Sequence, residues 1–168
     1  SEAQEIGAVN TIKIENGKLT GYNTDHFGFE NSLNPHLKSH HKRALILGTG
    51  GASKAVAFAL KKLGIHFEYV SRTPSSSVKY SYESLAIEGI ENYQIIINCT
   101  PLGTFPDVHK CPTIPYEHIT SNHLLFDLIY NPEETLFLKH GNAKNATTLN
   151  GLEMLRLQAE KSWEIWNS

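Results

Sequence analysis

A glycine-rich turn in the middle of the chain has the residue types and spacing that bind a nucleotide. The sequence GTGGAS at Gly48–Ser53 follows the apolar run ALIL and leads into the helix-forming stretch 54–63. A strand, a glycine turn and a helix together bind a dinucleotide pyrophosphate in many folds. Gly48 permits the tight turn, and Gly50 leaves room for phosphates beside the backbone. The helix N-terminus offers N–H groups and a partial positive charge to an anion.

This turn departs from the usual G-x-G-x-x-G pattern at one position. The third glycine of the pattern would fall at position 53, which is Ser53. A glycine turn after a strand can also be only a tight connection. The strand before it and the helix after it favour nucleotide binding.

The end of the next apolar strand indicates which dinucleotide would bind. An acidic residue there suits the ribose 2′-hydroxyl of NAD, whereas an arginine suits the 2′-phosphate of NADP. Here the strand ends in Ser71, Arg72 and Thr73, with no carboxylate nearby. An arginine forks onto phosphate oxygens, and the flanking hydroxyls can add donors. The alternative is a solvated arginine in a turn, but its place in the pattern favours NADP.

Two further segments carry polar groups at places where a site could form. Asp25 follows Asn23 and Thr24 at a strand-to-helix junction, where an aspartate is often only an N-cap or first-turn residue. From the sequence alone, that structural role is the simpler interpretation. The segment Asn98–Gly103 (NCTPLG) leaves the carboxyl end of another apolar strand, the edge that faces ligands in open α/β sheets.

The hydrophobic pattern predicts alternating strands and helices around these segments. The continuous apolar runs 95–97 and 124–126 are typical of strands covered on both faces, so we expect an α/β fold with a Rossmann-like parallel sheet flanked by helices. Asn16-Gly17 predicts a hairpin turn. The expected strands are 9–14, 19–22, 44–47, 66–70, 95–97, 124–126 and 146–149, the expected helices 25–33, 52–63, 82–87, 133–140 and 152–166, and the expected connections a polar linker at 35–42 and a serine-rich loop at 74–77.

The C-terminal helix is amphipathic and needs a large partner surface. The preceding chain offers no obvious one. One face is expected to hold Leu152, Leu155, Gln158, Ala159, Ser162 and Trp166, widened by Leu157, Trp163 and Ile165.

Composition excludes several classes of protein. A formal charge of −2 with mixed signs argues against nucleic-acid binding. Nine scattered histidines and two cysteines, Cys99 and Cys111, lack metal-ligand spacing, so we expect no metal and free thiols in a reducing compartment. No apolar run reaches the ~20 residues of a membrane span. No leader opens the chain, which predicts a cytoplasmic protein. The chain starts at Ser1 and its only methionine is Met154, so we expect a processed protein or a fragment.

Taken together, the motifs resemble those of the shikimate dehydrogenase family, over its C-terminal two-thirds. They cover essentially the whole chain in the family's order, and as a set they are highly specific. The matching segments are IGAVNT (Ile6–Thr11), GYNTDHFGF (Gly21–Phe29), LGTGGASKA (Leu47–Ala55), SRT (Ser71–Thr73), NCTPLG (Asn98–Gly103), FDLIYNPEET (Phe126–Thr135) and NGLEML with Gln158.

The resemblance implies an NADP-dependent oxidoreductase that interconverts 3-dehydroshikimate and shikimate. It implies a remnant of the substrate domain at 1–24, an NADP domain at 25–150, and a tail helix, 151–168, that packs back toward the substrate domain. Asp25 would be the carboxylate of the family's catalytic Lys–Asp pair and, with Asn10, Tyr130 and Gln158, would bind substrate. The implied cofactor contacts are Gly48, Gly50, Gly51, Ala52, Ser71, Arg72, Thr73 and Thr100, with Leu128, Gly151 and Met154 around the nicotinamide.

Departures from the family pattern leave other interpretations open. The N-V-T-x-P-x-K segment that carries the family's lysine is absent, so we expect no useful activity from this chain alone. Ser75-Ser76-Ser77 replaces a second basic residue, for which Lys79 could substitute, and SRT replaces the usual NRT. A non-catalytic nucleotide-binding module is disfavoured by the four retained substrate residues. A quinate dehydrogenase that uses NAD is disfavoured by Arg72.

Overall fold

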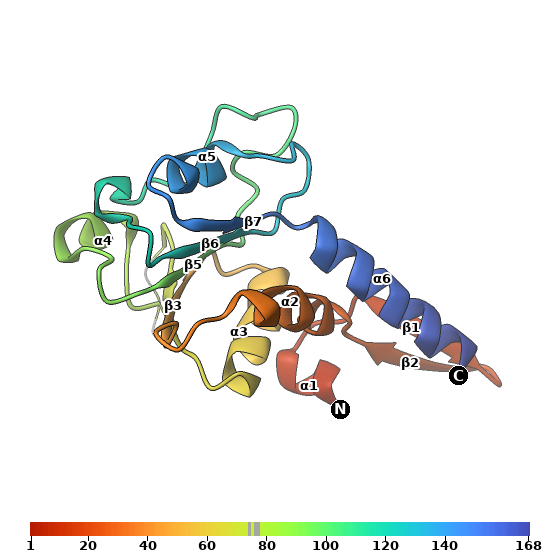
Figure 1. The fold of residues 1–168 in the computed structure, drawn as a ribbon. Helices are drawn as coiled ribbons and strands as arrows, with labels where there is room; N and C mark the ends of the chain where they lie inside the picture. Colours follow the sequence, from red (N-terminus) through yellow and green to blue (C-terminus); the bar gives the residue numbers. More distant parts are fainter. Residues whose placement is uncertain (74, 76–77) are drawn as a thin grey trace.

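Five parallel strands form the central sheet of this protein (Figure 1). The computed structural model describes residues 1–73, 75 and 78–168, with only the backbone at 87 and 88. The strand order is β4-β3-β5-β6-β7, so the chain changes direction across the sheet between β3 and β5. The predicted α/β class with a Rossmann-like parallel sheet is confirmed. The strand bounds are β3 (Arg43–Leu47), β4 (His66–Val70), β5 (Ile95–Asn98), β6 (Leu124–Asp127) and β7 (Thr147–Leu149).

Helices cover both faces of the sheet because its strands are apolar on both sides. Alternate residues of β3 show this: Ile46 belongs to the core under α2 (Asp25–Leu33) and α3 (Gly51–Lys62). Its neighbour Leu45 belongs to the core under α4 (Tyr82–Glu88) and α5 (Leu136–Asn142). Both side chains are fully buried. Two short 3₁₀ helices, η1 (Asn34–His36) and η2 (Tyr116–His118), lie in the connections.

The predicted hairpin is present as β1 (Thr11–Glu15) and β2 (Lys18–Tyr22). Glu15 pairs with Lys18, so Asn16 and Gly17 form the turn, and both have positive φ angles of 50° and 76°. Positive φ at both positions suits the right-handed twist of the flanking strands. Strand β1 begins two residues later than the expected start at residue 9.

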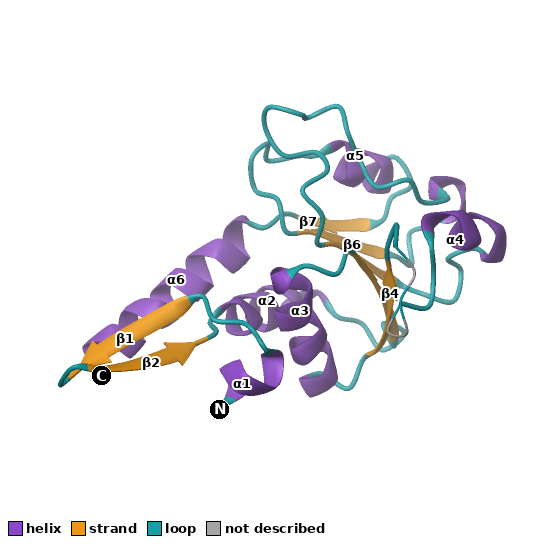
Figure 2. Ribbon diagram, turned by 180° about the vertical axis from the view of Figure 1, so that it is seen from behind, coloured by secondary structure: helices purple, strands orange, loops and turns teal. Residues whose placement is uncertain are grey.

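The hairpin is polar on the side that packs and apolar on the side that faces outward. Its inner face meets α6 (Leu152–Asn167): Thr11 Oγ1 lies 2.7 Å from Ser162 Oγ, and Lys13 donates to the carbonyl of Ser168. Figure 2 shows the hairpin and α6 side by side, away from the sheet. The outer face carries Val9, Ile12, Ile14 and Leu19, which are 53–71% exposed.

Most of the apolar stripe expected on the tail helix is left uncovered within this chain, and Ser162 is its one buried member. Met154 and Ser162 are the buried residues of α6. Leu152, Leu155, Trp163 and Trp166 remain exposed. Helix α6 packs mainly against α2, with a smaller contact to β1. Its expected packing against a substrate domain stays a prediction.

Gly28 explains why α2 can receive α6 so closely. A Cβ atom at this position would lie 2.5 Å from the carbonyl oxygen of Met154 and 3.1 Å from the backbone nitrogen of Gln158. Both contacts are with backbone, so neither can move aside as a flexible side chain would. A glycine inside α2 therefore sets the distance between the two helices.

We expect Gly28→Ala to destabilise the protein. Alanine is favoured over glycine in a helix by about 1 kcal/mol, but overpacking of this kind costs about 1–3 kcal/mol, so the clash outweighs the propensity. Urea unfolding measures the difference. The control is Gly51→Ala in α3, where a Cβ meets no atom within 4 Å and no loss is expected. Equal stability of the Gly28 variant and the parent would contradict the close packing.

Other element boundaries differ from the sequence-based expectations for local reasons. Helix α1 (Glu2–Ile6) was not expected. Helix α5 begins at Leu136 and not at residue 133, because the Thr135 side chain accepts a hydrogen bond from Leu138 N and caps it there. The expected linker at 35–42 includes part of η1. Apart from Ser75, the expected loop at 74–77 lies outside the described residues.

Two buried histidines support the turns that lead into β3 and β6. His41 Nδ1 accepts the backbone N–H of Lys38 at 3.0 Å, and His123 Nδ1 accepts that of Thr120 at 3.0 Å. Each side chain is about 95% buried. Burial lowers the pKa of both imidazoles, because the charged form would lose its hydration. A protonated Nδ1 could not accept either bond, so both turns require neutral histidine.

Stability should therefore fall with acidification through these two groups. The pKa of each histidine is lower in the folded protein than its unfolded value of about 6.5. Its contribution to the free energy of unfolding is therefore fully present above about pH 6.5 and is lost as the pH falls below that value. Urea unfolding at pH 7.5 and 5.5 should show the parent losing more stability than the double variant His41→Asn/His123→Asn, in which Asn oxygens can accept these bonds and do not titrate. Asp127, whose pKa is raised to about 6, and the buried His26 are present in both proteins and cancel in the difference. An equal loss in the two proteins would contradict the assignment.

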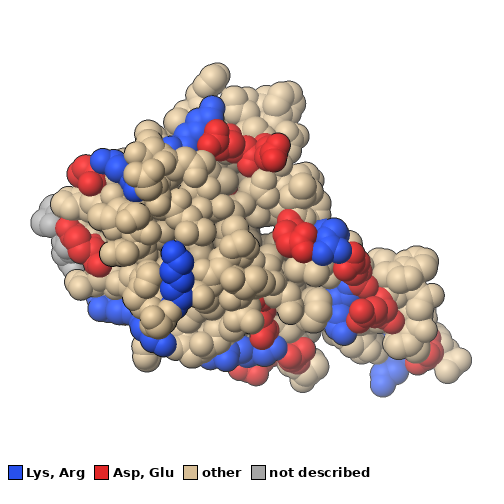
Figure 3. Space-filling view, viewed as in Figure 1, with Lys and Arg blue, Asp and Glu red and all other residues tan. Residues whose placement is uncertain are grey.

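The surface carries charges of both signs. Figure 3 shows Lys and Arg mixed with Asp and Glu over the visible face, including along α6. On α6, Arg156 bridges Glu153 and Glu160. Among the helices of the described ranges, none has the length and apolar character needed to cross a membrane.

Candidate functional site

A cavity of about 360 Å³ opens at the carboxyl ends of β3, β4 and β5. This is the place where the strand order reverses, and open α/β sheets bind ligands at such a point. Five residues proposed from the sequence as cofactor contacts line it: Gly48, Gly50, Ser71, Arg72 and Thr100. Five more residues that the sequence did not single out as contacts complete the lining: Thr49, Tyr82, Cys99, Pro101 and Leu102.

The glycine turn has the geometry that close approach of a phosphate requires. Gly48 has a φ of +98°, and a Cβ there would lie 3.1 Å from Thr100 Cγ2. At Gly50 and Gly51 a Cβ would meet no protein atom within 4 Å. Packing inside the protein therefore does not require glycine at Gly50, and a side chain there would extend into open space at the cavity. The turn fits a pyrophosphate against its backbone and the N-terminus of α3.

Ser53, which stands in place of the third glycine, has a local function in the turn. Its hydroxyl donates to the carbonyl oxygen of Gly50 at 2.6 Å, and its backbone N–H donates to the same oxygen at 3.1 Å. The side chain is 1% exposed. The serine thereby helps to start α3, and it does not block the cavity.

A buried polar pair behind the cavity holds two of its loops. Asn98 ends β5 and Asp127 ends β6, and the Asn98 amide donates to Asp127 Oδ1 at 3.1 Å. Asn98 Oδ1 accepts the backbone N–H and the hydroxyl of Thr100, at 3.0 and 2.7 Å. Asp127 also accepts from the hydroxyl of Thr135 at 2.6 Å and from Ile129 N at 3.1 Å. Burial raises the pKa of Asp127 to about 6. Sequence reasoning missed this pair, although each residue is the one polar member of an apolar strand.

Arg72 and Tyr82 both line the first cavity. Arg72 is exposed, and the Ser71 hydroxyl oxygen accepts the backbone N–H of Thr73 at 3.3 Å. Burial raises the pKa of Tyr82, and the nearby positive charge of Arg72 opposes that rise. Thr73 does not line the cavity. Neither does Lys79, which pairs with Glu68 at 3.5 Å.

A second cavity, of about 370 Å³, lies where α2, α6 and the loop after β6 meet. Its lining unites residues that are far apart in the sequence. All four residues proposed as substrate contacts line it, namely Asn10, Asp25, Tyr130 and Gln158, together with four proposed cofactor contacts, Ala52, Leu128, Gly151 and Met154, and with Leu155. Gly50 borders the first cavity and Ala52 the second, so the N-terminus of α3 lies between them. Gly51 lines neither cavity.

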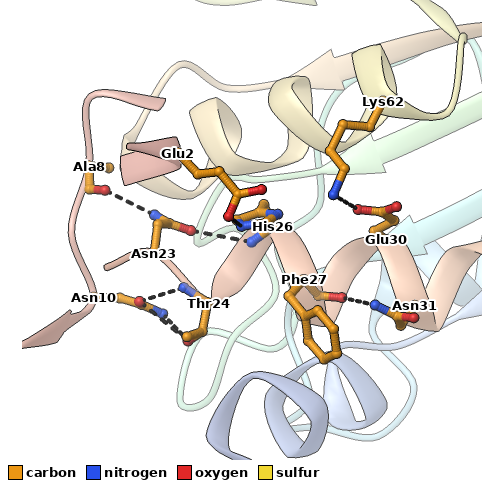
Figure 4. A network of polar contacts seen from close by, with 10 residues as sticks. All are labelled: Glu2, Ala8, Asn10, Asn23, Thr24, His26, Phe27, Glu30, Asn31 and Lys62. Atoms are coloured by element: carbon orange, nitrogen blue, oxygen red, sulfur yellow. Dashed lines mark hydrogen bonds and ion pairs between the residues drawn. The ribbon is translucent and has the colours of Figure 1, made fainter. Parts of the chain in front are cut away.

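Asn10 and Asp25 lie side by side in the lining of the second cavity and are hydrogen-bonded to each other. Asn10 Nδ2 donates to Asp25 Oδ1 at 2.8 Å, while Asn10 Oδ1 accepts the backbone N–H of Thr24 at 2.8 Å. Figure 4 shows Asn10 turned toward Thr24 at the start of α2. Thr24, and not Asp25, is the N-cap of α2. Burial raises the pKa of Asp25, and the hydrogen bond from Asn10 partly offsets the rise.

Gly151 brings the tail helix against the loop after β6. A Cβ at Gly151 would lie 2.0 Å from the carbonyl oxygen of Leu128, so any larger residue would push the two segments apart. Its backbone N–H donates to Ile129 O at 3.0 Å. The ring of Tyr130 follows in the same loop and is 50% exposed at the cavity.

Comparison with known proteins gives consistent results. No family model matches the chain. A shikimate dehydrogenase (NADP(+)) of Methanococcus maripaludis is 42% identical over 179 residues, which are 98% of this chain and 64% of that protein. The structure of a Thermus thermophilus shikimate 5-dehydrogenase in complex with NADP(H) and shikimate is 34% identical, with a TM-score of 0.84 over 98% of this chain and 64% of that one.

A quinate dehydrogenase from Corynebacterium glutamicum in complex with NAD is also similar, at 26% identity and a TM-score of 0.84 over 98% of this chain and 64% of its own. The chain thus spans just under two thirds of the length of each of these relatives.

Proposed function

We propose that this chain, as a member of the shikimate dehydrogenase family, is the NADP-binding part of an enzyme that reduces 3-dehydroshikimate to shikimate. The observation that carries the proposal is the pair of cavities on either side of the α3 N-terminus. Arg72 borders one and Asp25 borders the other. A dinucleotide laid along both would have its 2′-phosphate beside the arginine and its nicotinamide beside the polar cluster.

The residues present fit this cofactor. Gly48 and Gly50 leave the backbone open to a pyrophosphate, and Arg72 with Ser71 can hold a 2′-phosphate. Leu128, Gly151 and Met154 form an apolar wall beside Ala52 that suits a nicotinamide ring. Thr100 is held in place by Asn98. We include Gly51 and Thr73 in the cofactor site, Gly51 as part of the turn and Thr73 as a donor beside Arg72.

The chemistry assigned to this chain is the binding of the ring hydroxyls and the handling of a proton. Bound NADPH would supply a hydride to the carbonyl carbon of the substrate. Asn10 and Asp25 would hold hydroxyl groups of the ring, with Tyr130 and Gln158 as further contacts. The carbonyl oxygen gains a proton in the reduction and loses one in the reverse oxidation. A carboxyl group whose pKa is raised by burial can take part in both directions, so Asp25 is suited to share in proton transfer at the reacting oxygen.

The proposal also divides the chain into functional parts. Residues 1–24 and the tail 151–168 would belong with a substrate domain, and 25–150 would form the NADP domain. The hairpin supports this division, because its outward face carries the exposed apolar side chains of Ile12, Ile14 and Leu19. Exposed apolar patches of this kind mark surfaces that other structure covers. The proposal places the protein in the cytoplasm, where the free thiols of Cys99 and Cys111 stay reduced.

Two alternatives have less support. A non-catalytic module would not need Asn10, Asp25, Tyr130 and Gln158 around one cavity. A quinate dehydrogenase that uses NAD would not need a cation at the position of Arg72.

Calorimetric titration of the purified chain with NADP⁺ and NAD⁺ tests the proposal. We expect NADP⁺ to bind more tightly, because only its 2′-phosphate can pair with Arg72. Equal affinities, or no binding of either cofactor, would overturn the assignment.

The chain alone should show no useful shikimate-dependent formation of NADPH. The family's lysine segment does not occur in its sequence, and general acid–base catalysis typically contributes about 10²–10⁴-fold. Absorbance at the nicotinamide band, with an intact homologue as reference, measures the rate. A rate near that of the homologue would contradict the division of labour between the two domains.

A further inference from the structure

Three buried hydroxyl groups meet behind the second cavity. Thr11 comes from β1, Thr24 from the N-cap of α2 and Ser162 from α6, and their exposed fractions are 2%, 1% and 5%. Ser162 Oγ lies 2.7 Å from Thr11 Oγ1 and 3.0 Å from Thr24 Oγ1. It also donates to the carbonyl oxygen of Gln158 at 2.9 Å. We call these three residues the hydroxyl cluster; Ser162 is its centre and does not line the cavity.

All the hydrogen bonds of the hydroxyl cluster can form at the same time only when Ser162 accepts from both threonines. A serine hydroxyl has one proton to donate and two acceptor positions. Its proton goes to Gln158 O, so Thr11 and Thr24 donate to it. Thr24 Oγ1 is then an acceptor for Asn10 Nδ2, at 3.0 Å. The second amide hydrogen of Asn10 reaches Asp25 Oδ1 at 2.8 Å.

We propose that Ser162 is a positioning residue that acts through Thr24 and Asn10 to fix the Asp25 carboxylate for its reaction. The inference rests on the proposed function, because only a reacting Asp25 gives this chain of contacts a catalytic purpose. It adds to that function a residue outside the cavity.

Loss of the Ser162 hydroxyl would redirect the two threonines toward the site. Without it, the nearest acceptor of Thr11 is Asn10 Oδ1 at 3.2 Å. Thr24 has Asn10 Oδ1 at 3.3 Å and Gln158 Oε1 at 3.3 Å. A buried hydroxyl without an acceptor is costly, so both will turn toward these amides. Movement of the Asn10 amide weakens its hydrogen bond to Asp25, and that bond lowers the pKa of Asp25.

Carboxyl-carbon NMR of the full chain labelled at aspartate tests this inference. The chain has only three aspartates, Asp25, Asp107 and Asp127, so each titration curve can be assigned. We expect Ser162→Ala to shift the Asp25 curve to higher pH and to leave the other two in place. Ser162→Thr, which keeps the hydroxyl, should restore the parent curve.

Ser32→Ala is the matched control. Ser32 is also a buried serine, 6% exposed, and its hydroxyl donates only within α2, to Phe29 O at 3.0 Å. The control removes the same group from the neighbouring helix and should leave the Asp25 curve unchanged. If Ser162 had only a structural role, Ser162→Ala and Ser32→Ala would both lower the melting temperature, and neither would move the Asp25 titration curve.

An unshifted Asp25 curve in folded Ser162→Ala would overturn the proposal. If that variant does not fold, Ser162→Cys replaces it, since a thiol keeps the shape of the side chain and hydrogen-bonds only weakly. An unshifted curve there has the same meaning. The titration needs neither cofactor nor turnover. An unshifted Asp25 curve in a Ser162 variant that binds NADP⁺ normally therefore refutes only the role of Ser162. If the unmodified chain does not bind NADP⁺ more tightly than NAD⁺, the proposed function itself is refuted.

Discussion

Replacing Arg72 with alanine is expected to weaken NADP⁺ binding at least about tenfold while leaving NAD⁺ binding nearly unchanged. A charge-assisted hydrogen bond contributes about 1.5–3 kcal/mol, and about 1.4 kcal/mol corresponds to a factor of ten. Arg72 is exposed at the cavity, so the lower end of that range applies. Calorimetric titration of NADP⁺ and NAD⁺ into the parent and into Arg72→Ala measures the change. In the parent, a higher salt concentration should reduce the difference between the affinities for NADP⁺ and NAD⁺.

Lys79→Ala is the control for the charge itself. Lys79 is a second cation seven residues further along the chain, but it pairs with Glu68 and lies over the Tyr80 ring, and it does not line the cavity. Its removal should leave the preference for NADP⁺ intact. A similar loss of NADP⁺ preference in both variants would indicate a general effect of positive charge. If Arg72→Ala weakened the binding of NADP⁺ and NAD⁺ equally, the arginine would contact a portion of the cofactor that both molecules share.

The sheet and the glycine turn could be predicted because their signals are local. Apolar runs such as 95–97 are typical of strands in a sheet covered on both faces, and the structure contains that sheet. Asn16-Gly17 needs no tertiary contact to form its turn. The residues of the second cavity could be gathered only through the family resemblance, since Asn10 and Gln158 are far apart in the sequence.

The packing of α6 could not be predicted, because a helical pattern does not identify its partner. Helix α6 comes close to α2 only because Gly28 has no side chain, and Ser162 is buried beside Thr11 of β1 and Thr24. Nothing in the local pattern of α2 or α6 records that contact. The role of Tyr82 was missed for a similar reason: an aromatic at the start of a helix usually indicates core packing, and only the fold places it beside Arg72.

Asp25→Asn should reduce kcat by about two orders of magnitude or more in an active enzyme that carries this chain. That is the effect of losing an acid–base partner. Asparagine keeps the size of the side chain and an oxygen that can accept from Asn10, so the cavity should keep its shape. It cannot exchange a proton at the reacting oxygen as a carboxylate does. Steady-state rates with shikimate and NADP⁺ measure the loss.

Stability separates this catalytic role of Asp25 from a role as a helix cap. Thr24 is the N-cap of α2, and the side chain of Asp25 is hydrogen-bonded to Asn10. Removing the charge of Asp25 at the helix N-terminus should therefore lower the free energy of unfolding by only about 0.3–1 kcal/mol. The variant should melt near the parent and bind NADP⁺ normally. Asp107→Asn, at an exposed aspartate paired with Lys110, should leave kcat unchanged. If the Asp25 variant kept its kcat but had a lower melting temperature, Asp25 would have a structural role, because the substitution would then affect stability and not the reaction.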